Sequence, residues 1–154
     1  QTEYSLFERS PETNDVLKTV REMGIGFVSY SPLGRGFLTG RLQTSDLGDD
    51  DFRKTMFPRL AAENIAQNQA LVDRITAIAS AKGVTPGQIA LAWTIAQGTT
   101  PIPGTRRIKY LEENAAAADI ALAPADLKAL DQAAPVGAAA GDRYVPAGMA
   151  ALNH

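Results

Sequence analysis

The stretch TTPIPGTRRIKYLEEN, residues 99–114, joins an apolar run, a Gly-Thr pair and a helix-forming segment that begins with two arginines. The run at 99–103 is typical of a buried strand, and it predicts a turn at 104–105 followed by a helix over 106–118. Unpaired backbone N–H groups and the helix dipole favour an anion at a helix N-terminus. The turn therefore predicts an anion site, most simply one for a phosphate.

Each residue of the turn has a property that suits a phosphate. Gly104 lets the backbone approach a ligand closely, Thr105 supplies a hydroxyl donor, and Arg106 adds a charge-assisted hydrogen bond. Arg107 brings a second cation to a helix N-terminus, where positive charge is unfavourable unless an anion lies nearby. A second interpretation stays open, in which the Gly-Thr pair only caps the helix and both arginines lie in water.

Upstream, the first thirty residues alternate between strand and helix. A short strand at 1–7 precedes a predicted helix over 10–23 with Ser10 as its N-cap, and a β-rich run follows at 25–30. Two strands joined by one helix predict a right-handed βαβ crossover in a parallel sheet. The predicted buried face of the helix consists of Val16, Leu17, Val20 and Met23.

Between these elements and the opening stretch, a long loop and two helices are predicted. The loop covers 31–63, and loops of such length inside a domain are usually functional. One helix ends at Gly83, and the next covers 85–98 and begins with a capping box from Thr85 to Gln88. The predicted buried stripe of the second helix consists of Ile89, Trp93 and Ala96.

A further helix around 125–133 and an irregular tail at 135–154 complete the prediction. Three parallel strands flanked by helices form an incomplete sheet with an unpaired edge. We therefore interpret residues 1–154 as one partial α/β domain. Since the chain opens with Gln1 inside a predicted strand, we expect further sequence upstream.

The composition excludes several classes of function. The chain is 45% hydrophobic and 21% charged, as in a soluble globular protein, and its net charge of −2 does not favour nucleic acid or anionic membranes. It contains no apolar run of the ~20 residues that a membrane span needs, and no leader peptide opens it. The lack of cysteine excludes thiolate chemistry and agrees with a cytoplasmic location. His154 is the last residue, so an internal histidine base or ligand is excluded.

A second candidate site lies in SYSPLGRG, residues 29–36, at the end of the second predicted strand, where parallel α/β folds bind ligands. Tyr30 offers a ring face to a flat heterocycle, and Arg35 can counter a phosphate charge. The alternative is a Pro-Gly turn beside a core tyrosine, and the GxGxxG fingerprint is absent from this loop. Further contacts to a phosphate are available at Ser31, Gly34 and Gly36.

Three other features favour structural interpretations. The acidic run DLGDDD at 46–51 lacks the ligand spacing of a calcium loop, so a solvated loop is favoured over a cation site. Arg143 and Tyr144 in the tail could contact a ligand, but surface packing is favoured. Gln1 by itself is a polar residue at a chain end.

Several motifs together resemble the aldo-keto reductases, and most closely their bacterial and plant NADPH-dependent branch. The matching segments are QTEYSL, GIGFVSYSPLGRGFLTG, FPRLAAEN, TPGQIALAWTIAQG, PIPGTRR and LEEN, in the order found in that family. The resemblance covers nearly all of the chain and fades after about residue 135. It implies a (β/α)8 TIM barrel, of which this chain is the C-terminal part with about strands six to eight and their helices.

The resemblance also implies where NADPH lies, across the carboxyl ends of the strands. Gln1 is expected to hydrogen-bond the nicotinamide carboxamide, and Tyr30 to stack on the nicotinamide ring. The residues expected to line the pyrophosphate are Ser31, Pro32, Leu33, Gly34, Arg35 and Gly36. The expected cradle of the 2′-phosphate consists of Gly104, Thr105 and Arg106, and the adenine contacts of Glu113 and Asn114. Either Lys109 or Tyr110 fills a position that is often basic in relatives, with Tyr110 able to stack on adenine.

The implied activity is the NADPH-dependent reduction of aldehydes or ketones to alcohols. The family's catalytic Asp, Tyr, Lys and His belong to earlier strands, and none of the chain's tyrosines nor His154 matches them. A TIM barrel needs ~250 residues, so this chain cannot close one by itself. We expect it to supply the cofactor-binding half of the enzyme and to require the N-terminal half as its partner. Alone, it is expected to be inactive. Two alternatives are a non-catalytic nucleotide-binding regulatory subunit and a half-barrel that pairs with itself.

Overall fold

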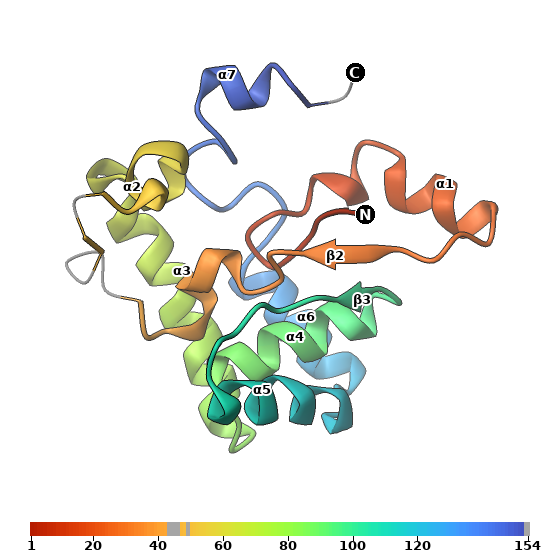
Figure 1. Ribbon diagram of the computed structural model, residues 1–154. Helices are drawn as coiled ribbons and strands as arrows, with labels where there is room; N and C mark the ends of the chain where they lie inside the picture. Colours follow the sequence, from red (N-terminus) through yellow and green to blue (C-terminus); the bar gives the residue numbers. More distant parts are fainter. Residues whose placement is uncertain (43–46, 49, 153–154) are drawn as a thin grey trace.

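Three short strands lie side by side in one parallel sheet, as the sequence predicts (Figure 1). The strands of this sheet are β1 (Thr2–Glu3), β2 (Val28–Tyr30) and β3 (Thr100–Pro101), and β2 is central. Thr2 and Pro101 both pair with Ser29, which sets the register on the two sides of β2. The computed structural model describes residues 1–42, 47–48 and 50–152.

The rest of the regular structure in the described residues is helical. Labels with α denote α-helices, and labels with η denote 3-10 helices. The N-terminal helices are η1 (Ser10–Glu12), α1 (Val16–Glu22), η2 (Gly34–Thr39), α2 (Phe52–Met56) and η4 (Pro58–Leu60). The later helices are α3 (Ala62–Ala81), α4 (Pro86–Ala96), α5 (Ile108–Ala115), η5 (Ala116–Asp119), α6 (Pro124–Ala133) and α7 (Pro146–Met149). None of those in the described ranges is long and apolar enough to cross a bilayer.

The core lies between the sheet and α4. Helix α4 packs against β3, and α3, α5 and η5 pack against α4. At its centre the ring of Trp93 lies 5.2 Å from that of Tyr4, which follows β1 and also meets Phe27 edge-on at 5.9 Å. All three aromatic residues are buried, so the helix layer is fixed against the sheet by aromatic packing.

The capping box that the sequence predicts at the start of α4 is confirmed. The Thr85 hydroxyl accepts a hydrogen bond from the Gln88 N–H at 3.2 Å, and the Thr85 N–H donates to Gln88 Oε1 at 3.0 Å. Ile89 and Trp93 are buried as expected, but Ala96 is exposed. The prediction for Ala96 was wrong because α4 is buried on every side along its middle and emerges from the core in its last turn.

The predicted continuous helix over 10–23 was wrong, since the chain forms η1 and then α1. Asp15 stands between them with a left-handed φ of 63°, and the Asn14 side chain accepts a hydrogen bond from the Val16 N–H at 3.3 Å. This side-chain bond offers the backbone an alternative to the helix. Because α1 then has one buried turn centred on Leu17, Met23 is 68% exposed instead of packing in the core.

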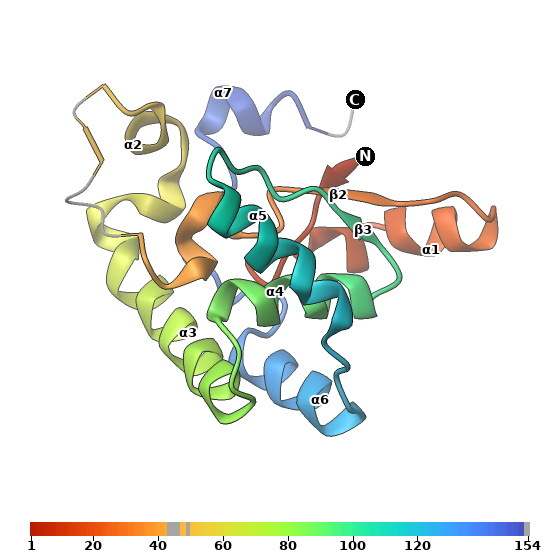
Figure 2. The ribbon, with the colours of Figure 1, turned by 60° about the horizontal axis from the view of Figure 1, so that its bottom comes forward.

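The segment 31–63 and the tail both contain short helices. The first, predicted as a loop, carries η2, α2 and η4, and α3 begins within it at Ala62. The tail, predicted as irregular, contains α7 and continues beyond it to residue 152. Figures 1 and 2 place α7 on the opposite side of the sheet from α6, so the chain between them passes from one side to the other.

Glu8 is a buried carboxylate that joins the N-terminal segment to η4. It accepts hydrogen bonds from the guanidinium of Arg59 at 2.7 Å, from the Ser10 N–H at 3.2 Å and from the Ser10 hydroxyl. Burial raises the pKa of Glu8, but the Ser10 bonds and the charge of Arg59 outweigh burial, so the pKa lies below its ordinary value of 4.5.

The lowered pKa of Glu8 predicts acid sensitivity. Because the folded pKa is below the unfolded one, the stabilisation is complete above pH 4.5 and is lost as the pH falls from there through the folded pKa. Glu8→Gln should therefore be less stable at neutral pH and should lose less stability on acidification. Urea unfolding between about pH 3 and 7 measures how the free energy of unfolding depends on pH in the unmodified protein and in Glu8→Gln. Parallel pH dependences would show that Glu8 does not have a lowered pKa in the folded protein.

Candidate functional site

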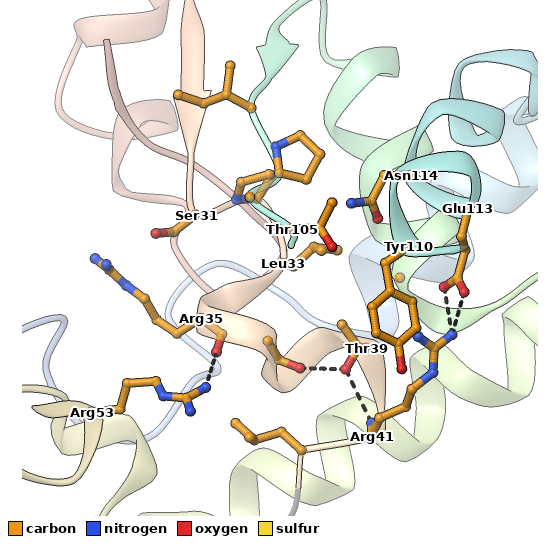
Figure 3. Close-up of a pocket in the computed structure, with 17 residues that line it drawn as sticks. Ser31, Leu33, Arg35, Thr39, Arg41, Arg53, Thr105, Tyr110, Glu113 and Asn114 are labelled. Atoms are coloured by element: carbon orange, nitrogen blue, oxygen red, sulfur yellow. Dashed lines mark hydrogen bonds and ion pairs between the residues drawn. The ribbon is translucent and has the colours of Figure 1, made fainter. Parts of the chain in front are cut away.

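A cleft of about 530 Å³ opens between the chain that follows β2 and the chain that follows β3 (Figure 3). Because β2 and β3 are parallel neighbours, their carboxyl ends meet at one edge of the sheet, where ligands of α/β folds bind. The lining residues are Ser31, Pro32, Leu33, Arg35, Gly36, Thr39, Arg41, Leu42, Arg53, Gly87, Ile102, Pro103, Gly104, Thr105, Tyr110, Glu113 and Asn114.

The wall after β2 is a tightly turned loop. Ser31 and Arg35 have left-handed φ values of 50° and 60°, which are unusual outside glycine, and Gly34 and Gly36 are also left-handed. At Gly34 a Cβ would lie 3.3 Å from Cγ of Leu38, so the turn is also close-packed. Backbone strain of this kind is concentrated at functional sites, where the surrounding structure maintains it.

The wall after β3 is the turn that the sequence singles out. The Thr105 hydroxyl accepts a hydrogen bond from the Arg107 N–H at 3.2 Å, and α5 begins at Ile108, two residues later than predicted. Arg107 is the N-cap, no side chain caps the helix, and its first turn holds no acidic residue. The N-terminus of α5 therefore retains its partial positive charge beside Gly104 and Thr105.

Cations outnumber acids along the cleft. Its lining includes three arginines, Arg35, Arg41 and Arg53, against one carboxylate, that of Glu113. Arg53 pairs with Asp51 at 2.7 Å, and hydrogen bonds from the Arg53 side chain and N–H lower the pKa of Asp51 to about 2. Arg41 and Arg53 are each paired with one carboxylate. Arg35 shares that of Glu3 with Arg143, so one positive charge remains in surplus, which suits an anionic ligand.

An ion pair joins the two walls at one end of the cleft. Nη2 of Arg41 donates to both oxygens of Glu113, at 2.6 and 2.7 Å, and the hydroxyl of Thr85 donates to the same carboxylate at 2.9 Å. The Arg41 guanidinium lies 4.9 Å from the centre of the Tyr110 ring, and Figure 3 shows both side chains at this end. Tyr110 lines the cleft, whereas Lys109 is exposed and is not among the lining residues.

The structure brings together ten of the fourteen residues predicted to bind a cofactor. These ten are Ser31, Pro32, Leu33, Arg35, Gly36, Gly104, Thr105, Tyr110, Glu113 and Asn114. Among the other four, Gln1 is exposed, Gly34 faces a small cavity behind the loop, and Arg106 is exposed beside the acidic residues Asp50 and Asp51.

Tyr30 is the remaining predicted site residue that does not line the cleft. It is the last residue of β2 and directly precedes the 31–36 loop. Its hydroxyl lies 2.9 Å from that of Tyr144 and accepts a hydrogen bond from Arg143. Burial and the Tyr144 bond raise the pKa of Tyr30 above its ordinary value, so its hydroxyl is neutral at physiological pH. Arg143 and Tyr144 are thus bonded to a predicted site residue, where the sequence favoured surface packing.

Sequence reasoning missed seven residues of the lining. They are Thr39, Arg41, Leu42, Arg53, Gly87, Ile102 and Pro103. No local pattern marks Gly87 or Arg53, because each reaches the cleft from a helix that only tertiary packing places there. His154, Asp46 and Asp49 lie outside the described residues, and within the described part of the chain no cluster of acidic, histidine or cysteine side chains is arranged as a metal site.

Comparison with known proteins gives a consistent family assignment. The sequence model described as "Aldo/keto reductase family" matches residues 1–135. A protein of Schizosaccharomyces pombe named "Aldo-keto reductase yakc [NADP(+)]" is 45% identical over 151 residues, which cover 95% of this chain and 44% of that protein. "Probable aldo-keto reductase 1" of Glycine max is 41% identical over 146 residues, 94% of this chain and 42% of its own length. The chain thus spans less than half the length of these relatives.

Solved structures agree with the sequence relatives. A thermostable aldo-keto reductase in complex with the inhibitor epalrestat superposes with a TM-score of 0.60 at 26% identity, over 86% of this chain and 38% of that one. The glycerol dehydrogenase of Gluconobacter oxydans shares the fold, with a TM-score of 0.77 at 24% identity over 86% of this chain and 41% of its own. The extent of the family match and the identity to curated relatives together show that this chain belongs to the aldo/keto reductase family.

Proposed function

We propose that this chain provides the cofactor-binding part of an NADPH-dependent carbonyl reductase, corresponding to about strands six to eight of a (β/α)8 barrel. The observation that carries the proposal is that the 31–36 loop and the 104–114 turn and helix line one cleft. These are the two segments in which the sequence independently predicts anion contacts. One elongated ligand with an anionic group at each segment accounts for both.

The residues of the cleft fit such a ligand. Its volume of about 530 Å³ is within the range of small-molecule sites, and its lining has a positive surplus. Arg35 is among the lining residues, and a guanidinium can make charge-assisted hydrogen bonds to a phosphate.

In this proposal the 2′-phosphate lies against Gly104, Thr105 and Arg106 at the N-terminus of α5, where N–H groups and the helix dipole favour an anion. Arg35 neutralises the pyrophosphate from the 31–36 loop. Tyr110 and Asn114 contact adenine, and Glu113 does so while paired with Arg41.

At the other end, Tyr30 presents its ring to the nicotinamide and Gln1 its amide to the carboxamide. Bound NADPH supplies the hydride that reduces a small aldehyde or ketone. In this proposal the groups that protonate the carbonyl oxygen lie in the rest of the barrel, which is also the partner that completes the sheet. The cytoplasm is the proposed compartment, and the absence of cysteine from the sequence is compatible with its reducing conditions.

A binding experiment tests the cofactor assignment. In the protein at its full natural length, NADPH should bind more tightly than NADH, and Arg106→Ala should weaken NADPH binding about tenfold while leaving NADH binding unchanged. Lys109→Ala is the matched control, since it removes an exposed cation outside the cleft. Titration of the nucleotide fluorescence measures all three proteins, and equal affinities of the unmodified protein for NADPH and NADH would overturn the assignment.

Turnover separates the proposed reductase from its alternative. The full-length protein should consume NADPH in the presence of a generic aromatic aldehyde, monitored by absorbance. A protein that binds NADPH tightly and consumes none with any of a panel of aldehydes and ketones would instead be a nucleotide-binding regulatory subunit.

A further inference from the structure

Arg35 lines the cleft, but its guanidinium is held by residues that do not line it. Its Nη2 donates to Oε2 of Glu3 at 2.8 Å and to the hydroxyl of Tyr144 at 3.0 Å. Its guanidinium lies 4.2 Å from the centre of the Phe57 ring, and that ring lies 5.7 Å from the ring of Tyr144. The direction of the Arg35 side chain is therefore fixed from β1, from the tail and from the residue before η4.

Two arginines share the buried carboxylate of Glu3. Nε of Arg143 donates to the same Oε2 atom at 3.0 Å, and the Glu3 side chain is only 4% exposed. Arg143 also donates to the hydroxyl of Tyr30, which lies 2.9 Å from that of Tyr144. Glu3, Arg35 and Arg143 together carry a net charge of +1. Because Glu3 is shared between the two arginines, it does not fully neutralise Arg35.

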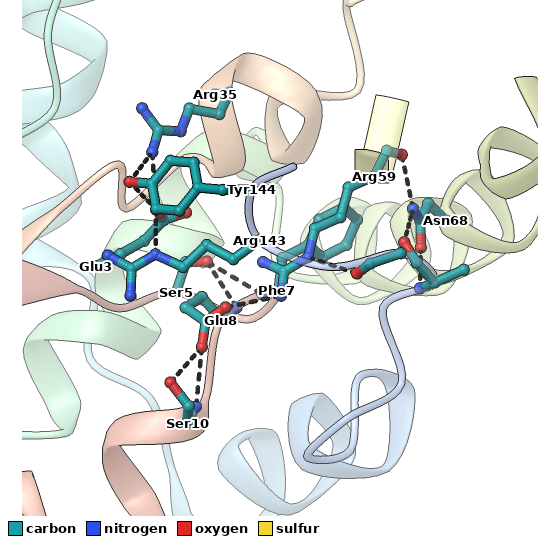
Figure 4. Close-up of polar contacts among 12 residues, drawn as sticks. Glu3, Ser5, Phe7, Glu8, Ser10, Arg35, Arg59, Asn68, Arg143 and Tyr144 are labelled. Carbon is teal, nitrogen blue, oxygen red and sulfur yellow. Dashed lines mark hydrogen bonds and ion pairs between the residues drawn. The ribbon is translucent and has the colours of Figure 1, made fainter. Parts of the chain in front are cut away.

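The tail that carries Arg143 and Tyr144 is anchored to α3. Asn68 is fully buried, and its side chain forms a reciprocal pair with Ala140, donating to the carbonyl at 3.0 Å and accepting from the N–H at 2.7 Å. Gln67 donates to the carbonyl of Ala138 at 3.1 Å, and Arg59 in η4 donates to that of Gly141 at 3.3 Å. Figure 4 shows Arg59 and Asn68 next to each other, joined by the bond from Nδ2 of Asn68 to the Arg59 carbonyl. The tail is thus placed by side chains more than seventy residues upstream.

We propose that Tyr144, supported by Arg143, is a positioning residue of the diphosphate subsite, acting through Arg35. Tyr144 fixes the guanidinium of Arg35 by one hydrogen bond and by packing its ring on Phe57. Arg143 donates a hydrogen bond to Glu3, so that the Glu3 carboxylate is shared between Arg35 and Arg143. This inference rests on the proposed function, because it assigns a partner to the arginine that faces the cofactor there.

The variant Tyr144→Phe isolates the positioning role. It removes the hydroxyl that accepts from Arg35 and keeps the ring on Phe57. The same hydroxyl lies 2.9 Å from that of Tyr30, and the Arg35→Met background described below separates the two contacts. In the protein at its full natural length, calorimetry should show NADP⁺ binding weakened about fivefold, the effect of losing one such hydrogen bond. Binding of adenosine 2′-phosphate should be unchanged, because that ligand reaches only the 104–114 side of the cleft.

A second variant tests whether Tyr144 acts through Arg35. Arg35→Met should weaken NADP⁺ binding by itself, and adding Tyr144→Phe to it should produce no further loss. Full additivity of the two changes, or equal weakening of NADP⁺ and adenosine 2′-phosphate by Tyr144→Phe, would overturn the inference and leave the proposed function standing. Undiminished NADP⁺ binding in Tyr144→Phe would likewise overturn only the inference. An unmodified protein that binds neither NADP⁺ nor adenosine 2′-phosphate would overturn the inference and the proposed function together.

Discussion

Replacing Trp93 with alanine is expected to lower the free energy of unfolding by about 3–5 kcal/mol, because it leaves a large cavity where the sheet meets the helices. The Trp93 side chain is fully buried, its ring lies 5.2 Å from that of Tyr4, and the guanidinium carbon of Arg9 lies 4.9 Å from its centre. Urea unfolding followed by circular dichroism in the far ultraviolet measures the loss.

The matched control is Trp93→Phe. The indole Nε1 of Trp93 is buried and has no hydrogen-bond partner among the described residues, so removing it breaks no bond. The phenylalanine variant should therefore lose much less stability than the alanine variant, since part of the ring packing survives. A loss below about 1 kcal/mol in Trp93→Ala would show that Trp93 is not the centre of the core.

The second large effect is expected for Gly141→Ala, with a loss of about 2–4 kcal/mol from backbone strain and steric overlap combined. Gly141 has a φ of +83°, and a Cβ there would lie 2.6 Å from Nδ2 of Asn64 and 2.9 Å from the carbonyl carbon of Pro58. The second of these contacts is with backbone, which moves less readily than a side chain. Thermal and urea unfolding both measure the loss.

Gly137→Ala is the control for the strain component. Gly137 has a similar φ of +77°, but nothing lies within 4 Å of the position that its Cβ would occupy. Its replacement should cost only about 1 kcal/mol, the strain of a left-handed backbone outside glycine. Equal losses at both positions would show that the close approach of Gly141 to Pro58 contributes nothing to stability.

Local signals in the sequence predicted several elements correctly. The capping box at Thr85 and the end of α3 before Gly83 both depend on residues close together in the chain. They were predictable because a cap or a left-handed glycine acts within one turn of its own position. The same holds for the turn at 104–107, where Thr105 organises the backbone before α5.

Predictions failed where two local signals competed or where packing decided. Pro11 and the apolar spacing favoured one helix, but the Asn14 side chain bonds to the backbone of Val16 and divides it. Met23 has the correct spacing for a core residue, yet no element covers it in the described structure. Hydrophobic spacing shows which face of a helix can be buried, and the rest of the fold determines whether anything covers it.

The sequence by itself predicted the three parallel strands, the start of α4 and the end of α3, the two loops that carry the predicted anion contacts, and the resemblance that suggests the cofactor. Only the tertiary structure decided that both loops line one cleft, that Arg41 pairs with Glu113 across it, and that Arg143 and Tyr144 hold Arg35. The physical reason is distance along the chain. Capping and turn geometry are fixed by neighbours, whereas the charge and direction of Arg35 depend on groups more than a hundred residues away.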